Sequence, residues 1–150
     1  MSCRGLSMIE LIIGVAIMAI ILGLVIAGFS GYRNQAVLNQ GTMAVLGLVR
    51  DARARTLVAK GNVAYGVHFD INQAVLFSGS VYQAGQAGNV AVSLPRGIGL
   101  ATTSLGVNEL LFTKLSGEPN VSGSLRLYRL VNPAAATTIT INPAGIVSTP

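Results

Sequence analysis

The sequence predicts an α+β fold in which a long N-terminal helix, transmembrane in its first half and amphipathic in its second, packs on a small antiparallel β-sheet or sandwich. Three observations predict it. The stretch from Leu11 to Phe29 is apolar and uncharged, and apolar residues then recur at helical spacing between Asn34 and Lys60. After Asn62 the apolar period changes to two, and the segments are separated by turns rich in Gly and Pro.

The N-terminal apolar segment is long enough to cross a bilayer. Leu11 to Phe29 is 19 residues, which at ~1.5 Å rise per residue matches the ~30 Å hydrocarbon core. Glu10 directly precedes it and is the only charged residue between Gly5 and Phe29. A carboxylate at the centre of a membrane helix costs ~2.5–3.5 kcal/mol, so Glu10 is a candidate functional residue that requires a partner.

Two interpretations of this segment are conventional. In a secretory signal, Arg4 would supply the positive charge and Ala27 would end a small-residue cleavage site. Such signals have an apolar region of ~7–15 residues and no acid in it, unlike this segment. In a plain single-pass anchor, Glu10 would lie in the first helical turn, where the helix dipole favours a carboxylate.

The third interpretation rests on a motif. Arg4-Gly5 followed by Leu6-Ser7-Met8-Ile9-Glu10-Leu11 resembles the N-terminal signature of type IV prepilins and type II secretion pseudopilins. This resemblance implies a leader peptide at 1–5, cleavage after Gly5 by a prepilin peptidase, N-methylation of Leu6, and Glu10 as the acid of the motif. The chain departs from the family pattern in having Leu6 in place of the usual Phe, and in lacking a proline near the middle of the helix.

The chemistry of the segment agrees with this resemblance. Cleavage would expose an ammonium group at Leu6, one helical turn before Glu10. A carboxylate in hydrocarbon is tolerable when it pairs with such a charge. The amine of a neighbouring subunit can meet Glu10 at only one axial stagger, so the pair would set the register of assembly, as a lone polar residue does in a coiled coil. Residues 6–30 would then form the membrane anchor and later the filament core.

The resemblance also implies partners and a location. The expected partners are other pilin or pseudopilin subunits, the prepilin peptidase, the inner-membrane assembly platform and membrane lipid. The chain would cross the cytoplasmic membrane once, with its N-terminus inside and its C-terminal domain outside, and would then enter a pilus or pseudopilus.

Residues 31–61 are predicted to continue the helix, to a total of about 50 residues. Asp51 and Arg55 form a favourable i,i+4 pair, and Gly61-Asn62 is a C-terminal stop signal. The helical stripe that we expect in the core consists of Leu38, Val45, Leu48, Val49, Ala52 and Ala59.

Residues 62–150 are predicted to form a β-rich domain of five to seven short strands. The segments that flank Asp70-Ile71-Asn72-Gln73 read as a hairpin, residues 83–89 as a loop, and Asn142-Pro143-Ala144-Gly145 as a turn. The predicted strands are Val63 to Phe69, Ala74 to Ser80, Val90 to Leu94, Leu110 to Leu115, Leu125 to Val131, Thr137 to Ile141 and Ile146 to Ser148.

The C-terminal part carries a second, looser resemblance. Leu111-Phe112, Ser116-Gly117-Glu118, Leu125-Arg126-Leu127-Tyr128, Thr138-Ile139-Thr140-Ile141 and Gly145-Ile146-Val147 are similar to the pattern of H-type minor pseudopilins and the related FimT minor pilins. The resemblance implies a minor subunit. That family commonly has a basic residue after its last glycine, where this chain has Ile146.

No motif predicts catalysis or a cofactor. His68 is the sole histidine and is expected on the face of a strand, and Cys3 is the sole cysteine. The acidic residues beyond the membrane segment are scattered and form no pattern of metal ligands: Asp51, Asp70, Glu109 and Glu118. We therefore predict a structural protein that is no enzyme and holds no cofactor or metal.

A second function is suggested by charge. Beyond the membrane segment the chain has nine basic residues against four acidic ones, and phosphate contact requires clustered Lys or Arg. Arg50 and Arg53 are neighbours on the predicted helix and form the candidate anion or DNA contact. The resemblance to FimT minor pilins implies a role of this kind, because some members of that family are thought to act in DNA uptake. A FimT-like minor pilin that binds DNA for uptake is the alternative to a purely structural subunit.

Overall fold

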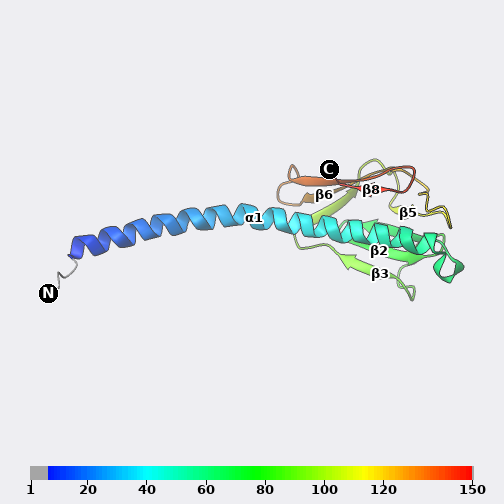
Figure 1. Cartoon of the computed structure of the whole chain (residues 1–150), viewed down its shortest axis with the longest axis horizontal. Coiled ribbons are helices and arrows are strands. Elements are labelled where there is room, and N and C mark those ends of the chain that lie inside the picture. Colours follow the sequence, from blue (N-terminus) through cyan, green and yellow to red (C-terminus); the bar gives the residue numbers. More distant parts are fainter. Residues whose placement is uncertain (1–6, 150) are drawn as a thin grey trace. The chain divides into compact units, whose positions relative to one another are not determined.

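The structure is a computed structural model that describes residues 7–149. Gly5 and Leu6, the predicted processing residues, lie outside the described residues. The chain divides into two compact units, residues 1–36 and residues 37–150. Helix α1 runs from Met8 to Leu57 and contributes to both units, and all eight strands belong to the second unit (Figure 1).

Helix α1 is 50 residues long, as predicted. In the first unit the side chains from Ser7 to Ile26 are all exposed. In the second unit the predicted stripe is confirmed, because its five residues between Leu38 and Ala52 are all buried. Thr42, Leu46 and Thr56 are buried on the same part of the helix.

The end of the helix differs from the prediction. Helix α1 ends at Leu57, and a short 3₁₀ turn, η1, follows at Lys60–Asn62. Ala59 has a left-handed backbone conformation with φ 50°, so it lies beyond the helix and is only half-buried. Gly61 and Asn62 also have positive φ values. The predicted stop residues therefore form the turn after the helix and do not cap its last residue.

The first sheet has the strand order β3-β2-β1-β5. The predicted hairpin is confirmed: β1 (Tyr65–Asp70) pairs antiparallel with β2 (Gln73–Ser78). Strand β3 (Val90–Ser93) pairs with the outer side of β2, and β5 (Glu109–Leu111) pairs with β1. Residues 83–89 form a loop, as predicted.

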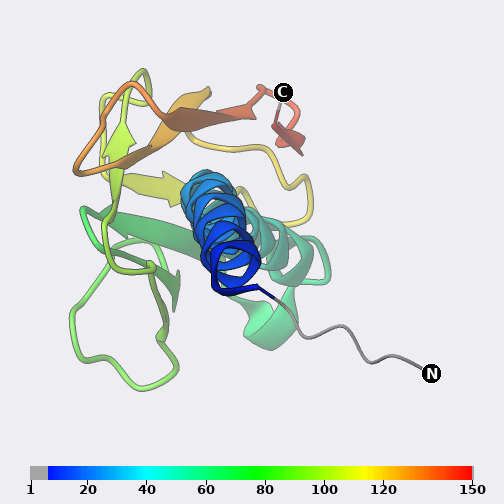
Figure 2. The same ribbon diagram turned by 90° about the vertical axis from the view of Figure 1, so that its left-hand side faces the viewer.

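The second sheet has the order β4-β6-β7-β8. Strand β6 (Gly123–Arg129) pairs with both β4 (Ile98–Thr102) and β7 (Ala136–Ile141). Strand β8 (Val147–Ser148) returns onto β7 after the predicted turn at residues 142–145. Figures 1 and 2 show the two sheets on different sides of the helical segment.

Several details of the strand prediction were wrong, and the two predicted hairpin strands extend two residues too far at Val63 and at Ser80. Strand β4 was not predicted, because Gly97 and Gly99 interrupt the alternating pattern after Pro95. The segment predicted from Leu110 to Leu115 is a strand only to Leu111, since Phe112 makes a single bridge to Pro119. Strand β6 begins and ends two residues earlier than the predicted segment.

One hydrophobic core holds the helix and both sheets together. It contains the buried face of α1 together with residues of both sheets, such as Val67 and Leu76 in the first and Leu127 and Ile139 in the second. Phe77 is also fully buried, and a Cβ atom added at Gly66 would lie 2.6 Å from its Cζ atom. A glycine at position 66 therefore allows the aromatic ring to pack on the neighbouring strand.

A buried hydroxyl connects α1 to the start of β1. The Thr56 side chain has 0% exposure. Its Oγ1 donates to the carbonyl oxygen of Ala52 at 2.9 Å and accepts the N–H of Tyr65 at 3.0 Å. The second bond satisfies a buried main-chain donor that the sheet leaves free. Without it, this donor would lose its partner in a place that water does not reach.

We predict that Thr56→Val destabilises the protein by about 1–3 kcal/mol, because valine keeps the shape of the side chain but leaves the N–H of Tyr65 unsatisfied. The measurement is urea unfolding of the full chain in detergent, followed by circular dichroism.

Thr42→Val is the matched control. Thr42 is also buried, and its Oγ1 donates to the carbonyl oxygen of Leu38 at 2.9 Å, but it accepts no main-chain N–H. Its replacement should therefore cost much less. Equal losses for the two variants would contradict the role assigned to the bond between Thr56 and Tyr65.

Candidate functional site

The N-terminal segment of α1 is the first candidate site. Among the described residues, one helix is long and apolar enough to cross a membrane, and its most apolar window is entirely unburied. The core helix of a soluble protein would bury such residues. The exposed side chains include Leu11, Ile12, Val15 and Ile20, each more than half exposed. This segment therefore presents an apolar surface that its own chain does not cover.

Glu10 lies in the first turn of α1, as predicted. The N–H of Ser7 is 3.5 Å from Glu10 Oε2, and the N–H of Glu10 is 3.4 Å from Ser7 Oγ. Both contacts are long, but together they have the reciprocal pattern of a capping box, in which a serine and a glutamate three residues later bind each other's main-chain donors. Glu10 is exposed, so its carboxylate can also meet a group from outside the chain.

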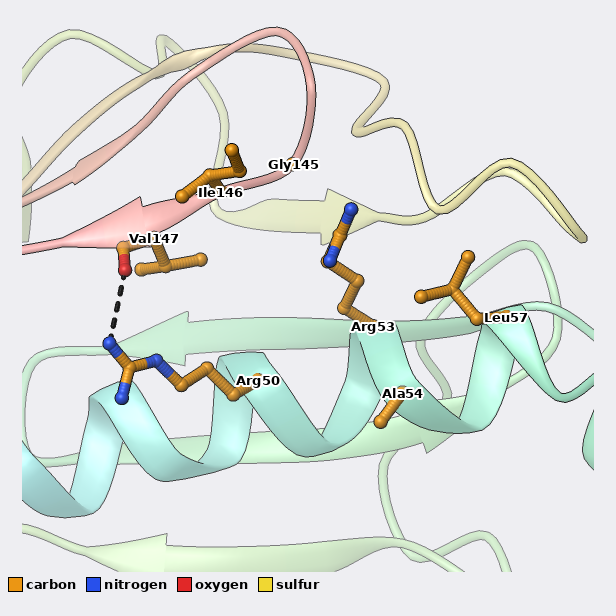
Figure 3. Close-up of a pocket in the computed structure, with 7 residues that line it drawn as sticks. All are labelled: Arg50, Arg53, Ala54, Leu57, Gly145, Ile146 and Val147. Atoms are coloured by element: carbon orange, nitrogen blue, oxygen red, sulfur yellow. Dashed lines mark hydrogen bonds between the residues drawn. The ribbon is translucent and has the colours of Figure 1, made fainter.

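Arg50 and Arg53 project from one face of α1 towards the turn between β7 and β8 (Figure 3). An Nη atom of Arg50 donates to the carbonyl oxygen of Val147 at 3.2 Å. The guanidinium of Arg53 donates to the carbonyl oxygens of Gly117 at 3.2 Å and Ala144 at 3.1 Å. The two side chains therefore join the helix to β8 and to two turns.

The two arginines also line a shallow pocket of about 290 Å³ with Ala54, Leu57 and residues 145–147. Asp51, the acid nearest to them in sequence, pairs with Arg55 at 2.8 Å. This hydrogen bond raises the pKa of Arg55 above its usual value. Neither Arg50 nor Arg53 has a carboxylate partner within residues 7–149. The pocket thus carries two positive charges that no acid of the described chain neutralises.

The sequence did not predict a cluster around His68. The His68 and Tyr82 rings stack with their centroids 4.1 Å apart, and Tyr82 also meets the edge of Phe77. His68 Nδ1 is buried, lies 3.5 Å from Glu109 Oε1 and makes no hydrogen bond. The pairing of β1 with β5 places His68 opposite Glu109. Tyr82 comes from the loop after β2, whose path the sequence does not indicate.

Metal binding finds no support in this geometry. Among the described residues, no three His, Cys, Asp or Glu side chains lie close enough together to hold a metal ion. His68 and Glu109 are two potential ligands without a third. The chemistry of the described sites is that of an apolar segment headed by a carboxylate and of a basic pocket at the other end of the helix.

Comparisons with known proteins identify the fold. No protein-family model matches the chain, and no curated protein matches it. Two crystal structures of the type IV minor pilin FimU from Pseudomonas aeruginosa, in different crystal forms, are similar. The first has a TM-score of 0.63 and 12% identity, and covers 79% of this chain and 92% of that chain. The second has a TM-score of 0.54 and 13% identity, and covers 77% and 91%.

At this level of identity the likeness concerns the fold alone. The predicted fold class is confirmed, since this chain has one long N-terminal helix packed on a two-sheet antiparallel β domain, as in FimU. The processing residues Gly5 and Leu6, the assembly role of Glu10 and the anion contact of Arg50 and Arg53 stay predictions.

We predict that Gly145→Ala destabilises the protein by about 2–5 kcal/mol. Gly145 has φ 73°, a conformation that costs a residue with a Cβ atom about 1–2 kcal/mol. The added Cβ would also collide with the carbonyl oxygen of Gly117 and lie 2.8 Å from Arg53 Nε, and such overpacking costs about 1–3 kcal/mol. Thermal unfolding of the full chain measures the loss.

Gly85→Ala separates the two causes. Gly85 has φ 76°, but open space surrounds the position of its missing Cβ. This control should therefore lose only the conformational part. If the two variants lose the same stability, the packing of Arg53 between the two turns does not contribute as we describe.

Proposed function

We propose that this protein is a pilin-like structural subunit. A prepilin peptidase cleaves it after Gly5 and methylates the new N-terminus at Leu6. The mature chain then assembles through residues 6–30 into a type II secretion pseudopilus or a type IV pilus, as a minor subunit. It is a substrate of the peptidase and not an enzyme. Before assembly it crosses the cytoplasmic membrane once, with its C-terminal domain outside.

One observation carries this proposal. The uncharged segment that begins at Leu11, whose side chains are exposed as far as Ile26, follows Glu10 directly and belongs to a chain with the fold of a minor pilin. An exposed apolar surface of this length in water would drive aggregation. Lipid can cover it before assembly, and the helices of neighbouring subunits can cover it afterwards. A single segment can therefore serve as both anchor and filament core.

Glu10 supplies the register in this scheme. When the segment leaves the membrane and enters a bundle of apolar helices, the carboxylate of Glu10 loses the water near the membrane surface and needs a positive partner. The methylated amine at Leu6 of a neighbouring subunit is a partner of the required charge. The capping contacts with Ser7 are both near 3.5 Å, so they are weak bonds that a charged partner can replace.

The second candidate function is DNA binding for uptake. It is favoured by the two positive charges of Arg50 and Arg53, which no carboxylate of the described chain neutralises. Each guanidinium already donates to main-chain carbonyl oxygens, but a guanidinium has five N–H donors. Its remaining donors can contact phosphate. The same charges equally suit a structural role, so the experiment on DNA below decides between the two.

For the structural function we predict that Glu10→Val inserts normally into the membrane but no longer enters filaments, because valine removes the charge that selects one axial stagger. The wild-type protein and the variant are expressed in the native host, and membrane and sheared filament fractions are compared by immunoblot. Intact-mass analysis of the wild-type protein from the filament fraction should give a chain that begins at Leu6 and carries one additional methyl group.

Glu118→Val is the matched control, because Glu118 is an exposed acid outside the segment. It should enter filaments like the wild-type protein. A wild-type chain that retains Met1, or one that is cut near Ala27, would refute the proposed processing. Unchanged entry of Glu10→Val into filaments would refute the role of Glu10.

For the DNA function we predict that the full chain in detergent binds duplex DNA with an affinity that falls steeply with salt. Each phosphate contact adds about −0.9 to the slope of log K against log salt concentration. Arg50→Gln should therefore reduce the magnitude of the slope by about 1. Arg96→Gln is the control, because Arg96 is exposed and distant in sequence from the pocket. Absence of binding at low salt would leave the structural function alone.

A further inference from the structure

The edges of the two sheets differ in how the chain covers them. An edge strand directs alternate main-chain N–H and C=O groups away from its sheet, where another strand can bind them. The four edges are β3 and β5 in the first sheet and β4 and β8 in the second. At three of these edges, groups of the chain itself bind at least part of the outward main-chain groups.

Strands β5 and β8 are short, with three and two residues, and other groups of the chain bind part of their outward main-chain groups. Leu111 of β5 faces outwards, and Asn120 binds both of its main-chain groups: Asn120 Oδ1 accepts its N–H at 2.9 Å, and the Asn120 N–H donates to its carbonyl oxygen at 2.8 Å. Val147 of β8 faces outwards, and its carbonyl oxygen accepts the bond from Arg50 at 3.2 Å.

Strand β4 is covered by the first sheet. The outward-facing N–H of Leu100 donates to the carbonyl oxygen of Ile71 at 3.0 Å, in the turn between β1 and β2. The side chains of Ile98 and Leu100 are buried. This edge therefore lies against the hairpin and is not available to another strand.

Strand β3 is the exception. The N–H of Leu94 donates to the carbonyl oxygen of Asn72 at 2.8 Å, which fixes the alternation of the ladder between β2 and β3. Val90, Val92 and Leu94 direct their main-chain groups towards β2, so Ala91 and Ser93 direct theirs away from it. Ala91 and Ser93 are exposed, and no hydrogen bond among the described residues reaches their outward groups.

The side chains of β3 do not protect this edge either. Exposed edges are usually blunted by charged residues, by proline or by a bulge, but Val90–Ser93 is Val-Ala-Val-Ser. Val92 packs against the core, whereas Ala91 and Ser93 are small and leave room beside them. In Figure 1, β3 forms the lower margin of its sheet.

We propose that β3 is a docking edge to which a different polypeptide adds an extended, uncharged segment as a fifth, antiparallel strand of the first sheet. The two residues with free outward groups would form four main-chain hydrogen bonds with this segment. An apolar residue of the segment would lie opposite Val92, where cross-strand pairs of β-branched side chains are favourable.

A second copy of the chain fits this edge less well. Self-pairing of β3 around a two-fold axis would make the α1 segments of the two copies antiparallel, because β3 runs beside α1 in the opposite direction (Figure 1). Copies anchored from the same side of a membrane keep their helices in one direction. This step rests on the proposed function, whereas the free edge itself does not.

The test uses the full chain in detergent and a capped pentapeptide, valine-threonine-valine-threonine-valine, as the probe. Amide hydrogen exchange is followed by NMR. We expect the N–H groups of Ala91 and Ser93 to exchange fast in the free chain and about tenfold more slowly at saturating peptide. The N–H groups of Val90 and Val92 should be protected in both states, because they bind β2.

Two matched peptides test the hydrogen bonds. Opposite β3, the second and fourth residues of the peptide would donate to the chain, whereas the third would point away. N-methylation of the second and fourth nitrogens should therefore abolish the slowing, and N-methylation of the third should preserve it.

Several results would overturn the proposal. They are slow exchange of Ala91 and Ser93 in the free chain, no slowing at millimolar peptide, and an equal effect of the doubly methylated peptide. A disulfide-linked dimer of the Val92→Cys, Cys3→Ser variant, without one for Val90→Cys, Cys3→Ser, would assign the edge to a second copy. These measurements use the purified chain, so their outcome does not depend on filament assembly, and failure of either proposal is seen separately.

Discussion

The buried face of α1 between Leu38 and Thr56 is the constraint on which the domain depends. It packs against residues of both sheets in one core, so the helix is a hydrophobic partner that the two sheets share. Polar bonds then fix the helix at each side. Thr56 binds the first strand of one sheet, and Arg50 binds the last strand of the other. Local changes along this face therefore affect both sheets.

The sequence was sufficient where the structure depends on nearby residues. The length of α1, the hairpin of β1 and β2 and the return of β8 onto β7 were all predicted, because periodicity and turn residues specify them locally. Gly5, Leu6 and Glu10 were also selected from one short motif, and their roles stay predictions. What the sequence could not indicate was the sheet to which each strand belongs. Strands β5 and β6 follow each other in the chain but lie in different sheets.

The other features that the sequence did not predict also depend on contacts between residues that are distant in the chain. Strand β4 contains a glycine and lacks alternation, and its position comes from pairing with β6, almost 30 residues further along the chain. Arg53 is separated in sequence from its partners Gly117 and Ala144 by 64 and 91 residues. The helical pattern therefore predicted only that the Arg53 side chain lies outside the apolar stripe of the helix. The stacking of Tyr82 on His68 depends on a loop whose path no local signal specifies.

The low charge of this chain connects its two unusual surfaces. Charged residues are 10% of the sequence, against about 25% in ordinary soluble domains, and arginines of the domain donate to its own carbonyl oxygens. Few charges are left to protect exposed apolar or hydrogen-bonding surfaces. An uncovered strand edge and an uncovered apolar helix are both unfavourable for a solitary protein in water. Both become favourable when other chains cover them, which is the condition of a subunit in an assembly.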